Sequence, residues 1–274
     1  MNFTEAVALG VVQGVTEFLP VSSSGHLVLF QHLLGIKEPM LAFDISVHVG
    51  TLFAVVIFFF KDIIGILKSL LRLISVLPDK KAAAGLMTED KGIRMALLII
   101  AGSVPTAVLG LLFKEMAETL FSSVTLVGVT LLITGLILWC TKWTGENGHG
   151  IRRFSVKGGL TVGLVQGLAI IPGISRSGST IAAGLFLGLD RETAARFSFL
   201  LSIPAIAGAG LLGAKDLIGQ SNLPFMVIAV GTLASCIVGY ASLKFLVWVV
   251  GRGRLYLFAP YCAAIGILAL VVGI

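Results

Sequence analysis

The chain has 274 residues, of which 57% are hydrophobic and 12% charged, and its mean hydropathy is +1.03. Because a soluble domain carries about 25% charged residues, this composition excludes a soluble globular protein and predicts an all-α polytopic membrane protein. We expect the formal net charge of +6 to come from basic segments that connect the spans, and not from a nucleic-acid-binding surface. Membrane lipids are therefore expected partners, and nucleic acid is not. No polar stretch approaches the ~50 residues of a small separate domain, which predicts a single integral membrane domain over residues 1–274.

The first apolar run, about residues 6–36, carries a polar interruption at its centre, Glu17-Phe-Leu-Pro-Val-Ser-Ser-Ser-Gly-His26. The run is long enough to enter a bilayer, since a span needs about 20 apolar residues. A lipid-facing helix would not carry such a centre, because each unsatisfied polar group in hydrocarbon costs several kcal/mol. We therefore predict a re-entrant helical hairpin that faces a wet cavity inside the protein.

The break in this hairpin is predicted to lie between Pro20 and the serine cluster. The first helix should end before Pro20. The second should begin at the serines, because Ser is a preferred N-cap whose hydroxyl accepts a hydrogen bond from an orphan backbone N–H. The N-terminus of the second helix would then point into the cavity, and its positive dipole end favours bound anions.

Six membrane spans and a second hairpin are predicted along the rest of the chain. Three spans are expected at about residues 40–60, 95–113 and 124–141, with a basic loop over 61–94 and a polar linker over 142–157. The second hairpin is expected at about 157–189, and the last three spans at about 196–214, 224–249 and 255–273.

The second half of the chain repeats the first. Val162-Gly-Leu-Val-Gln-Gly-Leu168 matches Leu9-Gly-Val-Val-Gln-Gly-Val15, and the same offset places Ser22 on Ser175, Ser23 on Arg176 and Glu17 on Ile170. Repeat one covers about 1–141 and repeat two about 157–274, each with a re-entrant helical hairpin plus three transmembrane helices. Because three is odd, the second half should insert upside down, which predicts an inverted repeat whose broken helices meet near the midplane.

The distribution of basic residues predicts the orientation. The segments 61–94, 142–157, 190–196 and 250–255 hold fifteen of the twenty Lys and Arg residues and fall on one face in this topology. The opposite face has only Lys37, Lys114 and Lys215. Cytoplasmic loops are enriched in Lys and Arg, so the mouth of the first hairpin should face the outside.

Three ionisable residues are candidates for chemistry. Glu17 lies four residues after Gln13, on the same helical face; acids at membrane depth are functional by default, and the alternative is a helix-end carboxylate at the interface. Arg176 carries a guanidinium suited to bidentate phosphate binding, with a snorkelling interfacial arginine as its alternative. His26 lies about one turn past the start of the serine cluster, and a structural histidine is its alternative.

The polar groups around the two breaks are expected either to bind substrate or to cap helices. They are Gln13, Ser22, Ser24, Ser175, Ser177, Gly178 and Thr180, with Ser23 in the same cluster. Asp44 and His48, spaced i, i+4 on one face of a span, are either supporting residues of the site or a polar packing pair.

Together these residues indicate phosphate chemistry. One arginine and two serine-rich helix N-termini would hold a phosphate or diphosphate. A carboxylate beside them would repel that anion unless it binds a divalent metal or takes a proton. Metal-assisted phosphoryl transfer uses both features, and the membrane location predicts a substrate with a lipid tail.

Glu17-Phe-Leu-Pro-Val-Ser-Ser-Ser-Gly-His26 and Pro172-Gly-Ile-Ser-Arg-Ser-Gly-Ser-Thr180 resemble the two signature motifs of the undecaprenyl-diphosphate phosphatase, or bacitracin-resistance, family. The resemblance spans the whole chain and implies hydrolysis of a polyprenyl diphosphate lipid, undecaprenyl diphosphate, to the monophosphate. This reaction recycles the lipid carrier of peptidoglycan synthesis on the outer face of the bacterial plasma membrane.

The resemblance also implies roles for individual residues. Glu17 corresponds to the essential acid, which would hold a metal or orient the nucleophile, and Ser23, His26 and Arg176 fall on the family's motif positions. Arg176 would bind the diphosphate, and His26 would act as acid/base. A divalent metal, Mg or Ca, is expected. The family's acidic motif begins with Glu or Gln; Gln13 is the neutral option, which leaves one acid fewer for a metal.

The sequence leaves three alternatives open. The nucleophile is Ser23, a water molecule in its place, or His26. Inverted repeats with paired broken helices are also typical of transporters, so transport of a lipid phosphate is a second functional class. Homodimerisation is open as well.

Overall fold

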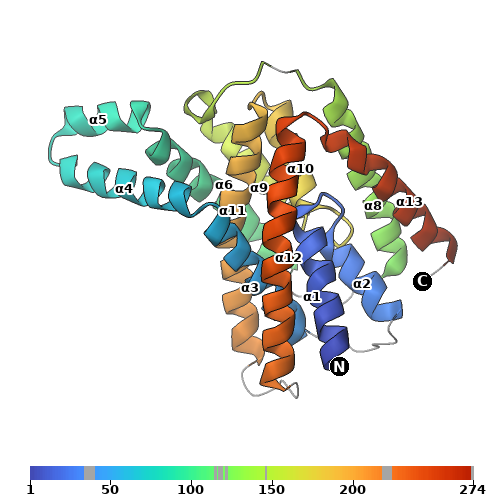
Figure 1. Ribbon diagram of the computed structural model, residues 1–274. Coiled ribbons are helices and arrows are strands. Elements are labelled where there is room, and N and C mark those ends of the chain that lie inside the picture. The colour runs from blue at the N-terminus through green and yellow to red at the C-terminus, as the bar shows by residue number, and fades with distance from the viewer. Residues whose placement is uncertain are drawn as a thin grey trace.

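The computed structural model describes residues 1–33, 41–113, 116, 120, 123–145, 147–217 and 224–272. Over these residues the chain is helical and has no strand, as predicted, and Figure 1 shows the arrangement. The first half contains α1 (Phe3–Phe18), α2 (Ser23–Leu33), α3 (Leu41–Phe58), α4 (Phe60–Val76), α5 (Lys80–Glu89), α6 (Lys91–Phe113) and α8 (Val124–Cys140). The short 3-10 helices η2 (Thr141–Trp143) and η3 (Ile151–Arg153) lie in the linker. The second half contains α9 (Val156–Leu168), α10 (Arg176–Phe186), α11 (Arg191–Leu217), α12 (Phe225–Gly251), η4 (Leu255–Phe258) and α13 (Ala259–Val272).

The helices confirm a polytopic membrane protein. By length and apolar composition, α6, α8, α11 and α12 can each cross a bilayer, and α3 qualifies together with α4 as a pair bent by 71°. The remaining predicted span corresponds to a shorter apolar helix that includes α13. Each predicted span therefore has a helix, although α13 alone is short for a full crossing.

The prediction of a basic loop over 61–94 is wrong, because this segment forms α4 and α5. The prediction relied on charge alone. The apolar residues of α4 recur with helical spacing, and Asp79 caps α5 by accepting hydrogen bonds from the backbone N–H groups of Lys81 and Ala82, at 3.0 and 3.2 Å. In Figure 1 the two helices project sideways from the helical body.

The two halves pack through corresponding glycines. Helix α1 packs on α12, and its counterpart α9 packs on α6. A Cβ on Gly10 would lie 2.4 Å from the Gly231 carbonyl oxygen, and one on Gly163, 153 positions later, would lie 2.0 Å from that of Gly102. Small residues allow this close backbone approach between membrane helices. The matched contacts are those expected of related halves, and the inverted orientation stays a prediction.

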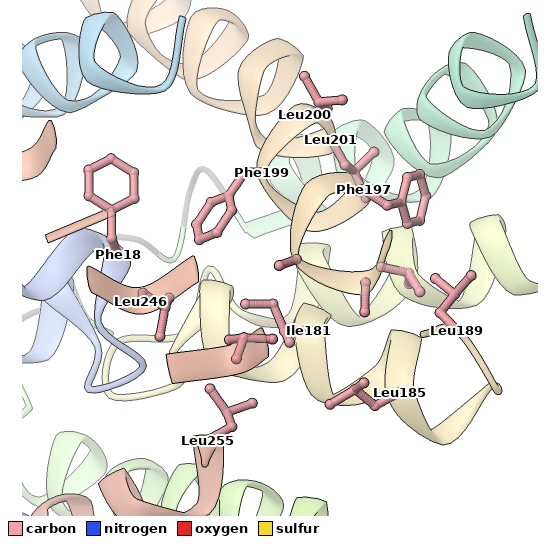
Figure 2. Packing of buried hydrophobic residues seen from close by; sticks show 14 of the residues in the cluster. Phe18, Ile181, Leu185, Leu189, Phe197, Phe199, Leu200, Leu201, Leu246 and Leu255 are labelled. Atoms are coloured by element: carbon pink, nitrogen blue, oxygen red, sulfur yellow. The ribbon is translucent and has the colours of Figure 1, made fainter. Parts of the chain in front are cut away.

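The main hydrophobic core includes the C-terminal end of α1, the first hairpin helix. Phe18 is fully buried, and its ring meets that of Phe199 edge-on with centroids 5.9 Å apart. Figure 2 shows Phe18, Phe199, Ile181 and Leu246 in this cluster, which joins α1, α10, α11 and α12. Because Phe18 directly follows Glu17 in the chain, the core fixes the backbone that carries the candidate acid.

Candidate active site

The first hairpin breaks where the sequence predicts. Helix α1 ends at Phe18, Pro20 follows, and α2 begins at Ser23. Ser22 adopts a φ of +69°, which is uncommon for a residue other than glycine. Its hydroxyl oxygen accepts a hydrogen bond from the Gly25 N–H at 3.3 Å, which caps the start of α2.

The second hairpin breaks in the same way. Ser175 is the N-cap of α10 and accepts a hydrogen bond from the Gly178 N–H at 3.1 Å. Two threonines of α8 stabilise the non-helical turn before it: Thr130 donates to the Pro172 carbonyl at 2.6 Å, and Thr134 donates to that of Gly173 at 2.9 Å. Gly173 has a φ of +90°, and a Cβ there would lie 1.9 Å from the Thr130 Oγ1, so only glycine fits.

The two breaks contact each other. The backbone N–H of Gly173 donates to the Ser22 hydroxyl at 3.1 Å, so one serine both caps α2 and holds the opposite turn. A Cβ on Gly178 would lie 2.9 Å from the Cβ of Pro20, which shows how closely the start of α10 approaches the first break. The helix N-termini of both halves therefore meet in one place inside the protein.

Glu17 is the centre of this junction. Its side chain is almost fully buried, with a relative exposure of 5%. Its Oε2 accepts hydrogen bonds from the Gln13 amide at 2.9 Å and from the Ser23 hydroxyl at 2.6 Å, and its Oε1 is paired with the guanidinium of Arg176. Charge-assisted hydrogen bonds of this kind offset the cost of burying a carboxylate. The structure thus brings together four of the predicted site residues, one of them from the second half.

Asp44 and His48, which the sequence left undecided, lie beside this centre. The Nε2 of His48 is 3.6 Å from the Glu17 Oε2. Its Nδ1 is 2.7 Å from the backbone carbonyl of Asp44, and since a carbonyl only accepts, Nδ1 carries the proton. The Asp44 carboxylate accepts a hydrogen bond from Gln31 at 2.7 Å. The i, i+4 spacing pointed to a linked pair, but the approach to Glu17 is a tertiary contact that spacing cannot reveal.

His26 lies in a separate hydrogen-bond pair. Its Nδ1 is 2.8 Å from the Ser22 carbonyl and its Nε2 is 2.7 Å from the Tyr261 hydroxyl, and the two rings stack with centroids 5.7 Å apart. Within the described residues, no hydrogen bond or ion pair joins His26 to Glu17 or Arg176. Tyr261 was missed from the sequence because it lies in α13, 235 positions away along the chain.

The remaining predicted polar residues mainly support the two turns. Ser24 pairs with Ser22, and Ser177 with Ser175, each at 3.3 Å between hydroxyl oxygens. Thr180 donates to the Arg176 carbonyl at 2.7 Å. The equivalent serine pairs show that the two halves use the same local structure to start α2 and α10.

Comparison with known proteins identifies the family. The model of the family described as bacitracin resistance protein BacA matches residues 6–268. The chain belongs to the BacA family. A BacA-family relative from Desulforapulum autotrophicum, named undecaprenyl-diphosphatase, is 50% identical over 273 residues, covering 100% of this chain and 99% of the relative. Relatives with the same name from Desulfosudis oleivorans and Methanosphaera stadtmanae are 51% and 45% identical, each over 100% of this chain and 99% of the relative.

Three buried polar atoms on the helices that form this junction have no hydrogen-bond partner in the described part of the chain. They are the Arg176 Nη1, the Gln13 Oε1 and the Ser179 Oγ. An unsatisfied buried polar group costs about 1–3 kcal/mol, so these atoms mark where a bound ligand would gain most. The free guanidinium nitrogen suits a phosphate oxygen, and the amide oxygen suits a cation.

Proposed function

We propose that this chain hydrolyses undecaprenyl diphosphate to undecaprenyl phosphate and inorganic phosphate. The observation that carries the proposal is the ion pair between the buried Glu17 and the partly buried Arg176, which joins the two polar helix breaks inside a membrane protein. The full-length relatives named undecaprenyl-diphosphatase support the same reaction, and lipid transport, the alternative from the sequence, is not favoured by them. The product would re-enter peptidoglycan synthesis as lipid carrier.

The diphosphate would bind at the junction of the two helix N-termini. The Nη2 of Arg176 is held by Glu17, and its Nη1 has no hydrogen-bond partner among the described residues, so the side chain could bind a phosphate oxygen without releasing Glu17. The N-terminal ends of α2 and α10 add the positive ends of two helix dipoles. The exposed apolar faces of the surrounding helices would leave the prenyl tail in the bilayer.

Ser23 is the nucleophile that the geometry favours. Its hydroxyl already donates to the Glu17 Oε2 at 2.6 Å, within the distance that a general base requires. In the first step the Ser23 oxygen would bond to the terminal phosphorus, its proton would pass to Glu17, and the bridging P–O bond would break to release undecaprenyl phosphate. In the second, water would hydrolyse the phosphoserine and regenerate Ser23.

His26 is less suited to the role of nucleophile. Both of its ring nitrogens are engaged, one by the Ser22 carbonyl and one by Tyr261, and within the described residues it has no hydrogen bond or ion pair with Glu17 or Arg176. Its hydrogen bond to the Ser22 carbonyl fixes the turn that presents Ser23. We therefore expect His26 to position this turn.

The residues present fit a divalent cation, Mg or Ca, as cofactor. The described residues contain no group of three or more His, Cys, Asp or Glu side chains that could hold a metal. Mg²⁺ commonly binds one or two carboxylates and completes its shell with water and substrate phosphates. Glu17 and the unpartnered amide oxygen of Gln13 would supply the protein ligands. When bound, the metal would neutralise the charge on the transferred phosphate.

We further propose a location in the bacterial plasma membrane with the site open to the outer side. The support is the charge asymmetry, since fifteen of the twenty Lys and Arg residues lie in segments of one face. In Figure 1 the N-terminus lies at the end of the molecule opposite the linker between the halves, and α13 runs away from that linker, in agreement with this topology.

Release of inorganic phosphate from a short prenyl diphosphate, measured with the purified protein in detergent, tests the proposed reaction. We expect multiple turnovers, with loss of activity in Glu17→Gln. Saturable binding of the lipid without phosphate release would instead favour a transporter.

A further inference from the structure

Helix α4 carries an apolar face that the rest of the described chain leaves open. None of its residues is buried. Phe60, Leu67, Leu71 and Ile74 are 57, 49, 65 and 62% exposed. Their spacings of seven, four and three residues put them on one side of the helix. A soluble surface would not present such a row without a partner.

A row of cations runs beside this face. Lys61, Lys68 and Arg72 are exposed and follow the same spacings of seven and four residues. At about 100° per residue, the row lies roughly a quarter-turn from the apolar one. Long basic side chains beside an apolar helix face can lay their stems on hydrocarbon and extend their charges to the headgroups.

The opposite side of α4 is attached to the protein body. Asp62 forms an ion pair with Arg196 of α11 at 2.5 Å. A Cβ on Gly92 at the start of α6 would lie 2.4 Å from the Ser69 hydroxyl, so α4 and α6 touch at this point. These contacts fix the rotation of α4 about its axis and keep the apolar row turned away from the body.

The direction of α4 follows from that of α3. The two helices are bent by 71° at Phe59. Transmembrane helices tilt by about 20° on average from the bilayer normal, so an α4 that leaves α3 at this angle runs roughly along the membrane surface. Figure 1 shows α4 and α5 extending sideways from the body in this way.

We propose that α4 is an interfacial helix that recognises anionic phospholipids. Its apolar row enters the acyl region of one leaflet, and Lys61, Lys68 and Arg72 bind headgroup phosphates. A second copy of the chain is less suited to cover the apolar face of α4, because face-to-face packing of two α4 helices would bring two rows of three cations together. The bilayer supplies both hydrocarbon and negative charge. This role goes beyond the proposed phosphatase function and does not depend on it.

Spin-label depth measurements test the immersion of α4. In a variant whose Cys140, Cys236 and Cys262 are replaced by alanine, a nitroxide is attached at position 71 or 68 in vesicles of phosphatidylcholine and phosphatidylglycerol. We expect the label at position 71 to be relaxed mainly by oxygen and the one at position 68 mainly by an aqueous nickel complex. Equal access of nickel to both labels would overturn the proposal, as would spin–spin broadening at position 71, which would show that a second copy covers the face.

Energy transfer tests the lipid preference. A fluorescent energy donor attached at position 71 reports the local enrichment of acyl-labelled phosphatidylglycerol over phosphatidylcholine. Each cation near a membrane surface contributes about 1 kcal/mol, or about five-fold in local affinity, so Lys68→Glu with Arg72→Glu should abolish the enrichment. The control, Arg152→Glu with Lys157→Glu, makes the same charge change outside α4 and should preserve it. No enrichment in the parent, or equal loss in both variants, would refute recognition by α4; thermal unfolding in detergent checks that each variant is folded.

Discussion

Replacing Arg176 with lysine keeps the positive charge of the proposed site and removes the planar fork. In the parent, the Nη2 of Arg176 is bound to Glu17, and the buried Nη1, which has no hydrogen-bond partner in the described part of the chain, is the proposed donor to a phosphate oxygen. A lysine has a single ammonium group and cannot hold both positions in the same geometry. The variant should therefore lose about one donor to the transition state. Such a loss costs roughly 2.7–4 kcal/mol, or about 10²–10³ in rate.

The assay is phosphate release from a prenyl diphosphate in detergent, with kcat and KM measured separately. If the free nitrogen acts mainly in the transition state, kcat should fall together with kcat/KM. Arg196→Lys is a matched control, because Arg196 is also paired with acids, Asp62 and Glu192, but lies outside the proposed site. Turnover of Arg176→Lys within about three-fold of the parent, in folded protein, would refute the reasoning, since even the smallest expected cost corresponds to about 10².

Four further predictions follow from the site, the packing and the charge distribution. Glu17→Gln should lower kcat at least as much as Arg176→Lys. The double variant should be little worse than the poorer single variant, because residues that act as a unit are not additive. A loss of kcat in the double variant equal to the product of the two single losses would show that the residues act separately. Prenyl diphosphates should be cleaved with a far higher kcat/KM than soluble diphosphates, and equal values would remove the lipid-tail argument. Gly163→Ala should lower thermal stability, because its Cβ would lie 2.0 Å from a carbonyl oxygen, whereas Gly208→Ala, which has open space, should not; equal melting temperatures would contradict the packing. In intact cells, a cysteine at position 84 should be shielded from an impermeant reagent and one at position 120 labelled, and the reverse pattern would invert the topology.

The helix breaks could be predicted from sequence because their causes are local. Pro20 lacks a backbone N–H, and the serine that follows it can cap a helix through its own hydroxyl, so α1 had to end and α2 had to begin within a few residues. The same reasoning located the start of α10 at Ser175. The apolar runs predicted the spans, but the charge pattern could not distinguish a loop from the amphipathic α4.

The partners of the site residues could not be predicted, because they come from distant elements. Nothing within the α1 sequence indicates that its glutamate meets His48 of α3, and nothing near His26 points to Tyr261 of α13. The threonines of α8 that hold the second turn were missed for the same reason. Spacing along one helix defines a face, and only the packing of helices determines which other face it meets.

The repeat explains why the site can be both rigid and chemically asymmetric. Positions that build the scaffold are the same in both halves: Ser22 and Ser175 each cap a helix, and Gly10 and Gly163 each allow a close crossing. Positions that carry charge differ, since the glutamate corresponds to an isoleucine and the arginine to a serine. Two identical acidic halves would place like charges together at the junction, which is costly at low dielectric. One acid from the first half and one basic residue from the second instead neutralise each other at the junction.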